Sequence, residues 1–287
     1  MRQLNFDLKT LLAENPERGF VTRRDRAYIL DQAADLLHEL GFRRLRARGL
    51  RRKHANALVR EWRRQGLSIG TLKNRMAALR WWAKRIDRPG VVGTNAEHGI
   101  GNRTYVTNED RSCRLDADRL ERVGDAHVRM SLRLQDVFGL RREEAIKFMP
   151  SYADRGDRVA IKATWAKGGR AREIPIWNER QRQVLDAARR LAGGGAMIAG
   201  GRNYKGQRKV YEKQTAAAGL ERMHGLRHAF AMDRYEGLTG WKAPAAGGPR
   251  QRSLTGAKRR IDTAARRTIA RELGHDRISV VAQYCGA

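Results

Sequence analysis

The segment from His224 to His228, His-Gly-Leu-Arg-His, places basic and titratable side chains at helical spacing. His224 and Arg227 are three residues apart, so on a helix they share a face and can point toward one ligand. Two histidines four residues apart are also the spacing of half a zinc site, or of two ordinary surface residues. The segment therefore indicates a candidate site without deciding its chemistry.

Other chemically suited residues flank this segment in a fixed order. Arg141 lies upstream in the run Gly-Leu-Arg-Arg-Glu-Glu, and Lys167 lies at the tip of a predicted β-hairpin with Gly-Gly at its turn. Downstream, His275 follows a Leu-Gly pair, where the glycine can end one helix in the left-handed conformation and the histidine can start the next. Tyr284 comes nine residues after His275. Five features thus occur in one order along the second half of the chain.

This order of arginine, hairpin lysine, His-x-x-Arg, Gly-His and tyrosine resembles that of the tyrosine recombinases, the family of phage integrases and Xer-type recombinases. The matching motifs span Gly139 to Tyr284, roughly half of the chain. Arg141 is assigned rather than Arg142, because it follows Gly-Leu and has Glu144, expected to be structural, three residues after it. The resemblance implies the catalytic set Arg141, Lys167, His224, Arg227, His275 and Tyr284.

The implied chemistry is cleavage and rejoining of DNA through a 3′-phosphotyrosine. Cleaving a phosphodiester without a metal requires a nucleophile, cations at the non-bridging oxygens and an acid for the departing sugar oxygen. By the resemblance, Tyr284 attacks the phosphorus and Arg141 and Arg227 bind the phosphate. Lys167 resembles the general acid that protonates the 5′ oxygen.

Two histidines complete the implied set. His224 would assist proton transfer to and from Tyr284, because a phenol with its ordinary pKa of ~10 is a poor nucleophile. His275 would hydrogen-bond the phosphate or pack beside it. The covalent intermediate keeps the energy of the broken bond, so the resemblance implies neither ATP nor a metal or other cofactor.

The sequence predicts two domains joined by a linker. Residues 1–90 are expected to form a helical domain, which matches the family's SAM-like core-DNA-binding domain only in size and character. Residues 91–108, rich in Gly and Asn, are the predicted linker. Residues 109–287 are the predicted catalytic domain, in which 237–264, rich in Gly, Pro and Arg, are expected to be a flexible insertion. The predicted fold class is mainly α with a small antiparallel β-sheet, in a two-domain clamp around DNA.

Hydrophobic periodicity places several of these elements. Apolar residues at spacings of three and four predict helices near 23–40, around 55–62, and from 68 to 86 with Ser68 as the N-cap. Alternating patterns predict two strands, at 158–165 and 171–176.

The charge balance predicts a polyanionic partner. Sixty Lys and Arg residues face 31 Asp and Glu, a formal net charge of +29. Such an excess favours nucleic acid, with acidic membrane surfaces second. The residues expected to contact phosphates are Lys73, Arg80, Lys84 and Arg85 on a predicted helix face and Arg259 and Arg260 in the predicted insertion. The alternatives are a solvated helix face and a merely flexible loop.

The resemblance also implies partners and leaves rivals open. It implies double-stranded DNA as substrate and a homotetramer acting on two DNA sites, for integration or excision of a mobile element. A degenerate recombinase acting as a DNA-binding regulator and a type IB topoisomerase are alternatives. A zinc hydrolase using His224, His228 and His275 is a third.

Other features bear on location and assembly. Two cysteines, Cys113 and Cys285, cannot form a disulfide framework, so a reducing cytoplasm is expected. No apolar run approaches the roughly 20 residues of a membrane helix, so no membrane association is expected. The interval between the histidine motifs is about twenty residues longer than is usual in the family. Three residues follow Tyr284, whereas family members commonly extend a tail that docks on a neighbouring protomer.

Overall fold

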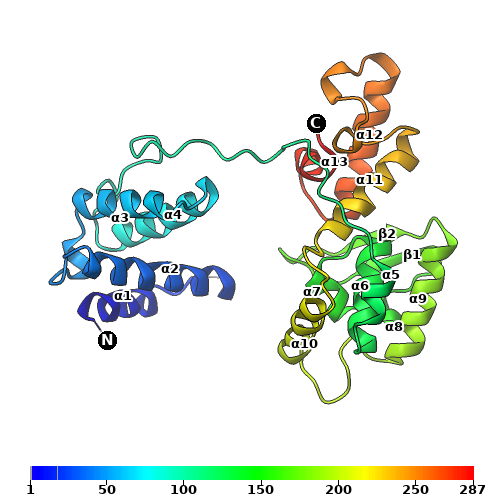
Figure 1. Ribbon diagram of the computed structural model, residues 1–287, viewed down its shortest axis with the longest axis horizontal. Helices are drawn as coiled ribbons and strands as arrows, with labels where there is room; N and C mark the ends of the chain where they lie inside the picture. The colour runs from blue at the N-terminus through cyan, green and yellow to red at the C-terminus, as the bar shows by residue number, and fades with distance from the viewer. Residues whose placement is uncertain (1, 18) are drawn as a thin grey trace. The chain divides into compact units, whose positions relative to one another are not determined.

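The chain forms two compact units, shown in a computed structural model that describes residues 2–17 and 19–287 (Figure 1). The first unit ends at Thr104 and the second begins at Tyr105, inside the segment predicted as a linker. Val92 and Ile100 are nevertheless buried in the core of the first unit. Much of the predicted linker therefore packs on that unit, because its few apolar side chains find partners there.

The first unit is helical, as predicted. Its helices are α1 (Gln3–Glu14), α2 (Phe20–Glu39), α3 (Arg52–Arg64) and α4 (Ile69–Arg85), with a 3₁₀ helix at Ala47–Gly49. Trp62 and Trp82 are fully buried in its core, and the indole of Trp82 donates a hydrogen bond of 2.9 Å to the Ala47 carbonyl. Ser68 caps α4 by accepting the Thr71 backbone N–H at 3.2 Å, as the sequence predicts.

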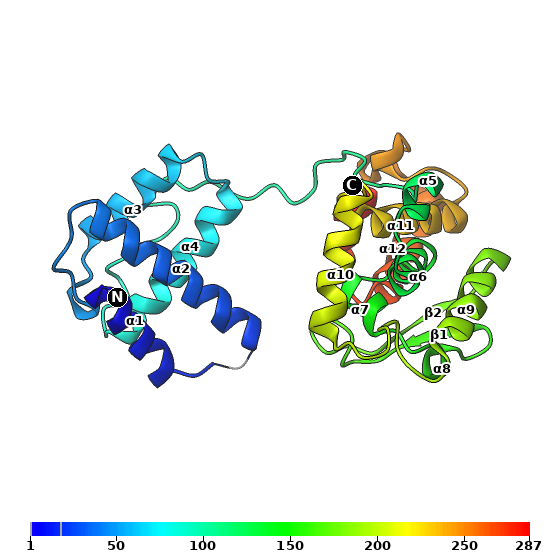
Figure 2. The ribbon, with the colours of Figure 1, turned by 60° about the horizontal axis from the view of Figure 1, so that its bottom comes forward.

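The second unit is built around the helices that follow residue 116. They are α5 (Ala117–Glu121), α6 (Ala126–Phe138), α7 (Arg142–Lys147), α8 (Pro150–Ala153), α9 (Glu179–Ala192), α10 (Tyr204–Ala217), α11 (Gly225–Thr239), α12 (Gly256–Glu272) and α13 (Ala282–Cys285). A 3₁₀ helix at Ile278–Val281 precedes α13. Helix α6 contacts α7, α9, α10 and α11, and α9 and α10 lie on opposite sides of it (Figure 2).

The described sheet has two antiparallel strands, β1 (Arg158–Ile161) and β2 (Arg172–Pro175). Both strands are shorter than predicted, and residues 162–171 form a longer loop between them. Trp165 is buried against Phe148 and Tyr152, which draws the chain out of the ladder after β1. The two glycines at 168–169 have positive φ angles of 85° and 68°, but they turn this longer loop and not a two-residue hairpin.

The segment 237–264, predicted as a flexible insertion, is packed. It holds the end of α11, 3₁₀ helices at Pro244–Ala246 and Gln251–Ser253, and the start of α12. Ala243 and Leu254 are buried, and a Cβ at Gly248 would lie 1.7 Å from the Lys242 carbonyl oxygen. The composition suggested mobility, because a count of Gly and Pro does not show that the intervening apolar residues reach the core.

Candidate active site

Arg227 lies at the centre of the candidate site. It is on the first turn of α11 and is 1% exposed. Its Nη1 donates to the carbonyl oxygen of Gly139 at 2.5 Å, and its Nη2 donates to the carbonyl of Leu273. Its Nε is 3.4 Å from Oη of Tyr284. The guanidinium therefore joins the end of α6, the end of α12 and the tyrosine of α13.

The backbone around Arg227 requires a glycine where α6 ends. Gly139 is left-handed, with φ 59°, and a Cβ there would lie 2.6 Å from the ring of Phe230. The close approach of this turn to α11 places the Gly139 carbonyl against the guanidinium. Leu226 and Phe230 of this helix are buried in the core.

Tyr284 lies among three histidines. It is 7% exposed, and the centroid of its ring is 4.8 Å from that of His228, 5.6 Å from His275 and 6.2 Å from His224. Nε2 of His275 is 3.1 Å from the tyrosine Oη. The structure thus brings His224, Arg227, His275 and Tyr284 together, as the sequence predicts. His275 lies in the loop between α12 and the next 3₁₀ helix and does not start a helix, because the chain runs on to residue 278 before it coils again.

These basic groups depress one another's proton affinity. Burial, followed by the charges of nearby groups including Arg227, lowers the pKa of His228 to about 4 and that of His275 to about 4. The pKa of His224 is lowered by burial and by Arg227 and Arg141. Burial lowers the pKa of Arg227 to about 10, which leaves the guanidinium charged at neutral pH. Neutral imidazoles beside a charged arginine can accept a proton from the phenol.

Arg141 reaches the site from the start of α7. Its Nη1 donates to Oε1 of Glu144 at 2.8 Å, and its backbone N–H donates to Oε2 at 2.8 Å. Glu144 is fully buried, which by itself raises the pKa of a carboxyl group. Hydrogen bonding and charge from Arg172, with the charges of Arg227 and Arg141, outweigh that burial and hold the Glu144 pKa at about 2.

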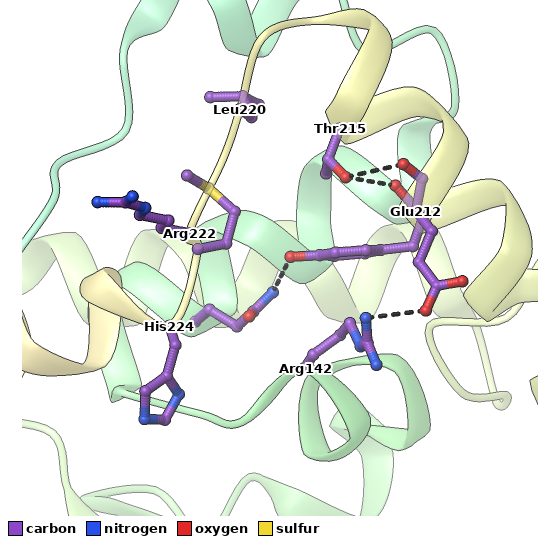
Figure 3. A pocket seen from close by; sticks show the side chains of 9 residues that line it. Arg142, Glu212, Thr215, Leu220, Arg222 and His224 are labelled. Carbon is purple, nitrogen blue, oxygen red and sulfur yellow. Dashed lines mark hydrogen bonds and ion pairs between the residues drawn. The ribbon is translucent and has the colours of Figure 1, made fainter. Parts of the chain in front are cut away.

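Arg142 is directed elsewhere. It pairs with Glu212 of α10 at 3.0 Å, on the wall of a cavity of about 390 Å³ (Figure 3). His224 and Arg222 line the same cavity. A second cavity of about 880 Å³ also includes His224 and His228 in its lining. His224 is exposed and is thus accessible from both cavities.

Lys167 lies outside the hydrogen-bonded cluster. It is exposed on the loop between β1 and β2, and within the described chain no hydrogen bond or ion pair joins it to the other predicted catalytic residues. The loop itself is tied to the site, because Arg170 forms an ion pair with Asp276, the neighbour of His275.

The predicted phosphate-contacting residues of the first unit differ in their surroundings. Arg80 donates to the Gly93 carbonyl at 3.1 Å and to Asn95 at 3.0 Å, and Arg85 lies 3.7 Å from Glu17. Lys73 is 3.3 Å from Asn102, and Lys84 is exposed. Arg80 therefore holds the loop that folds back onto α4, a contact that helical spacing could not indicate. In the second unit, Arg259 and Arg260 are exposed at the start of α12.

The catalytic set implied by the sequence leaves out two residues that lie in this cluster, His228, which was named only as a candidate zinc ligand, and Arg172. His228 packs against Tyr284, and its buried Nδ1 has no hydrogen-bond partner within the described residues. Arg172 is buried on β2 and binds Glu144. The signal for His228 was its place in the motif, whereas a buried arginine in a short strand is not distinguishable from an exposed one by pattern.

Among residues 2–17 and 19–287, no three His, Cys, Asp or Glu side chains are placed to hold a metal ion. No helix of the described chain combines the length and the apolar character needed to cross a bilayer.

Two family models match the chain. One, described as phage integrase, N-terminal, matches residues 1–88, and the other, described as integrase, matches residues 101–233. Together they account for most of the sequence. No curated protein matches the chain by sequence.

Solved structures of integrases share the fold. A lambda integrase tetramer bound to a Holliday junction matches with a TM-score of 0.63 and 16% identity, covering 98% of this chain and 76% of that one. The XerH site-specific recombinase bound to its palindromic difH substrate matches with a TM-score of 0.58 and 18% identity, over 98% and 80% of the two chains. The Tn1549 transposon integrase with circular intermediate DNA matches with a TM-score of 0.58 and 11% identity, over 99% and 95%.

The fold is that of a two-domain integrase, with a helical N-terminal domain and a catalytic domain. The chain belongs to the tyrosine recombinase family.

Proposed function

We propose that this protein is a site-specific DNA recombinase that cleaves and rejoins DNA through a 3′-phosphotyrosine at Tyr284. The observation that carries the proposal is the pair of contacts at its hydroxyl. Oη lies 3.4 Å from the Arg227 guanidinium and 3.1 Å from Nε2 of His275. A nucleophile, a cation for the phosphate and a neutral imidazole thus meet at one atom.

The proposed reaction needs no group from outside the protein and the DNA. Oη of Tyr284 attacks the phosphorus, the bond to the 5′ oxygen breaks, and the departing oxygen takes a proton from Lys167. Arg141 and Arg227 stabilise the charge that gathers on the non-bridging oxygens. Attack by a 5′-hydroxyl of another strand reverses these steps and restores the proton to the lysine.

A neutral imidazole accepts the phenol proton in this scheme. His275 is in hydrogen-bonding distance of Oη in the free protein, while His224 is the exposed imidazole of the cluster. We assign proton transfer to His224 once the phosphate is bound, and contact with the phosphate to His275. Burial and neighbouring cations lower the pKa of both rings, which favours the neutral form that can accept a proton.

The proposed substrate is double-stranded DNA, bound at two sites by a homotetramer that integrates or excises a mobile element. Support comes from the net charge of +29 and from structures with a similar fold, which include a lambda integrase tetramer on a Holliday junction and a transposon integrase with circular intermediate DNA. Among the residues predicted to contact phosphate, Lys84, Arg259 and Arg260 are exposed. We propose that these three bind DNA phosphates and that Lys73, Arg80 and Arg85 do so after exchanging their protein partners.

A DNA-binding regulator that has lost catalysis is the second candidate, and a nicked substrate separates the two. The protein is mixed with its nicked attachment site in excess EDTA and run on a denaturing gel. A recombinase traps a covalent protein–DNA band, and the Tyr284→Phe variant binds the site without forming that band. Binding without any adduct in the wild type would support the regulator. Relaxation of supercoiled plasmid by isolated monomers would instead indicate a topoisomerase.

A further inference from the structure

Arg172 is a buried arginine that none of the proposed reaction steps uses. Its side chain is 4% exposed on β2, and its guanidinium forms two parallel hydrogen bonds with the carboxylate of Glu144, at 3.0 and 2.7 Å. Its Nε donates to the backbone carbonyl of Glu272 at 2.8 Å. One side chain thus holds the start of α7 and the last turn of α12.

Each of these contacts leads directly to a residue of the proposed site. The Glu144 carboxylate that Arg172 binds also accepts both the backbone N–H and Nη1 of Arg141. The Glu272 carbonyl is next to that of Leu273, which accepts from Arg227. Arg172 and Arg227 therefore hold consecutive carbonyls, three and two residues before His275.

The chain around Arg172 is fitted to it. Gly274 has φ 69°, and a Cβ at that position would lie 3.0 Å from Cδ of Arg172 and 3.4 Å from its Nη1. A side chain at position 274 would therefore adopt a strained backbone conformation and press on Arg172, so glycine suits the turn before His275 on both counts.

The charge arrangement gives Arg172 a distinct task. Glu144 is fully buried, and a buried carboxylate must be paired to remain charged. Arg172 supplies a fork of two hydrogen bonds, so Arg141 need supply only one through its side chain, which is 19% exposed. The other guanidinium nitrogens of Arg141 can then bind a phosphate.

We infer that Arg172 is a positioning residue that sets the geometry of Arg141 and His275 for cleavage. The inference rests on the proposed function, because it concerns the same site. Without Arg172, the carboxylate of Glu144 has only Arg141 as a close partner and draws that guanidinium inward, and the turn before His275 loses one of its two anchors. The substrate is not contacted by Arg172 itself.

The test is the single-turnover rate of covalent adduct formation at saturating DNA, with binding and thermal unfolding measured in parallel. For Arg172→Met the rate should fall about 100-fold, or about 2.7 kcal/mol in activation free energy, as expected for displacement of a catalytic group by about 1 Å. Arg172→Lys keeps the charge but not the fork, and should lose about tenfold. The dissociation constant for DNA should stay within about threefold, since Arg172 does not reach the surface.

Two further variants separate positioning from stability. In Arg172→Met/Glu144→Gln no buried carboxylate is left unpaired, so stability should recover while the rate stays low. Arg234→Met is the matched control, because Arg234 binds the largely buried side-chain carboxylate of Glu272 at 2.8 to 3.1 Å, whereas Arg172 binds the backbone carbonyl of that residue, and within the described chain no hydrogen bond or ion pair joins Arg234 to a proposed catalytic residue. It should lower the melting temperature with a rate within about threefold of wild type. Equal losses of rate in Arg234→Met and Arg172→Met would overturn the inference.

A substrate with sulfur in place of the 5′ bridging oxygen tests the route of the effect. A thiolate leaves without protonation, so this DNA bypasses the general acid. It should not restore the rate of Arg172→Met, and restoration would mean that Arg172 acts through the loop carrying Lys167. If the wild type forms the adduct and the Arg172→Met/Glu144→Gln variant forms it equally fast, the inference is overturned while the proposed function stands. No adduct from wild type would overturn the proposed function, and the inference with it.

Discussion

Replacing Gly139 by alanine should destabilise the second unit through two costs, one from the backbone conformation and one from packing. The left-handed backbone, with φ 59°, costs an alanine about 1 to 2 kcal/mol. The added Cβ would lie 2.6 Å and 2.8 Å from two ring carbons of Phe230, which is fully enclosed by the core. Forcing an extra methyl into a packed core costs a further ~1 to 3 kcal/mol.

Gly156 supplies the matched control, because its φ is 84° and a Cβ there would meet nothing within 4 Å. Gly156→Ala therefore carries the backbone cost alone. Both alanines reduce the freedom of the unfolded chain equally, so that effect cancels in the difference. At about 3 °C per kcal/mol for a unit of this size, Gly139→Ala should lower the melting temperature by about 10 °C and Gly156→Ala by about 4 °C.

The assay is thermal unfolding of the full chain followed by circular dichroism, with adduct formation measured well below both transitions. Gly139→Ala should also slow adduct formation, because the Gly139 carbonyl accepts the 2.5 Å hydrogen bond from Arg227. Gly156→Ala should react at the wild-type rate. Equal melting temperatures for the two variants would refute the packing argument, and a normal rate for Gly139→Ala would refute the link to Arg227.

Three other predictions follow from particular groups. Lys167→Met should slow cleavage of ordinary DNA by about 10² to 10⁴-fold. The rate of this variant should recover on DNA with a 5′ bridging sulfur, and a rate that stays low on that DNA would contradict a general-acid role. Burial and neighbouring charges hold the pKa of His228 and His275 at about 4, whereas an imidazole in the unfolded chain has a pKa of 6.5. Between these two pH values the unfolded state binds more protons than the folded state, so stability is lost as the pH falls from 6.5 to 4. Urea unfolding at pH 7 and pH 5 measures this loss in the wild type and in a variant with both histidines replaced by glutamine. The free energy of unfolding should fall less in the variant, and equal falls would contradict the assignment of the loss to these two histidines. Ser68→Ala should cost about 1 kcal/mol of unfolding free energy by removing the cap on Thr71, and a change near zero would show that the cap contributes nothing.

Local signals were sufficient for three of the helices in the first unit, α2, α3 and α4, but not for α1. Ser68 marked the start of α4 because a side-chain cap depends only on residues three positions away. Arg227 lies far in sequence from His275 and Tyr284 and meets them in the structure, which only the resemblance to a family could predict.

What the sequence did not indicate depends on contacts between distant segments. Arg172 and Arg80 belong to a residue type that is normally exposed, and each is engaged by a partner that only the folded chain supplies. The strands end early because Trp165 turns into the core, and a β-pattern cannot show which aromatic side chain leaves the sheet. The packing of Leu254 likewise contradicts an expectation drawn from glycine and proline content alone.

The most direct test of the central claim is to identify the atom that becomes attached to DNA. A nicked attachment site labelled on the 5′ side of the cleaved phosphate is trapped with the protein in EDTA, digested with protease, and the DNA-linked peptide is sequenced by mass spectrometry. The account predicts a 3′-phosphate joined to Tyr284 and a released strand with a free 5′-hydroxyl. Attachment through another residue, or a released strand that carries the phosphate at its 5′ end, would contradict it.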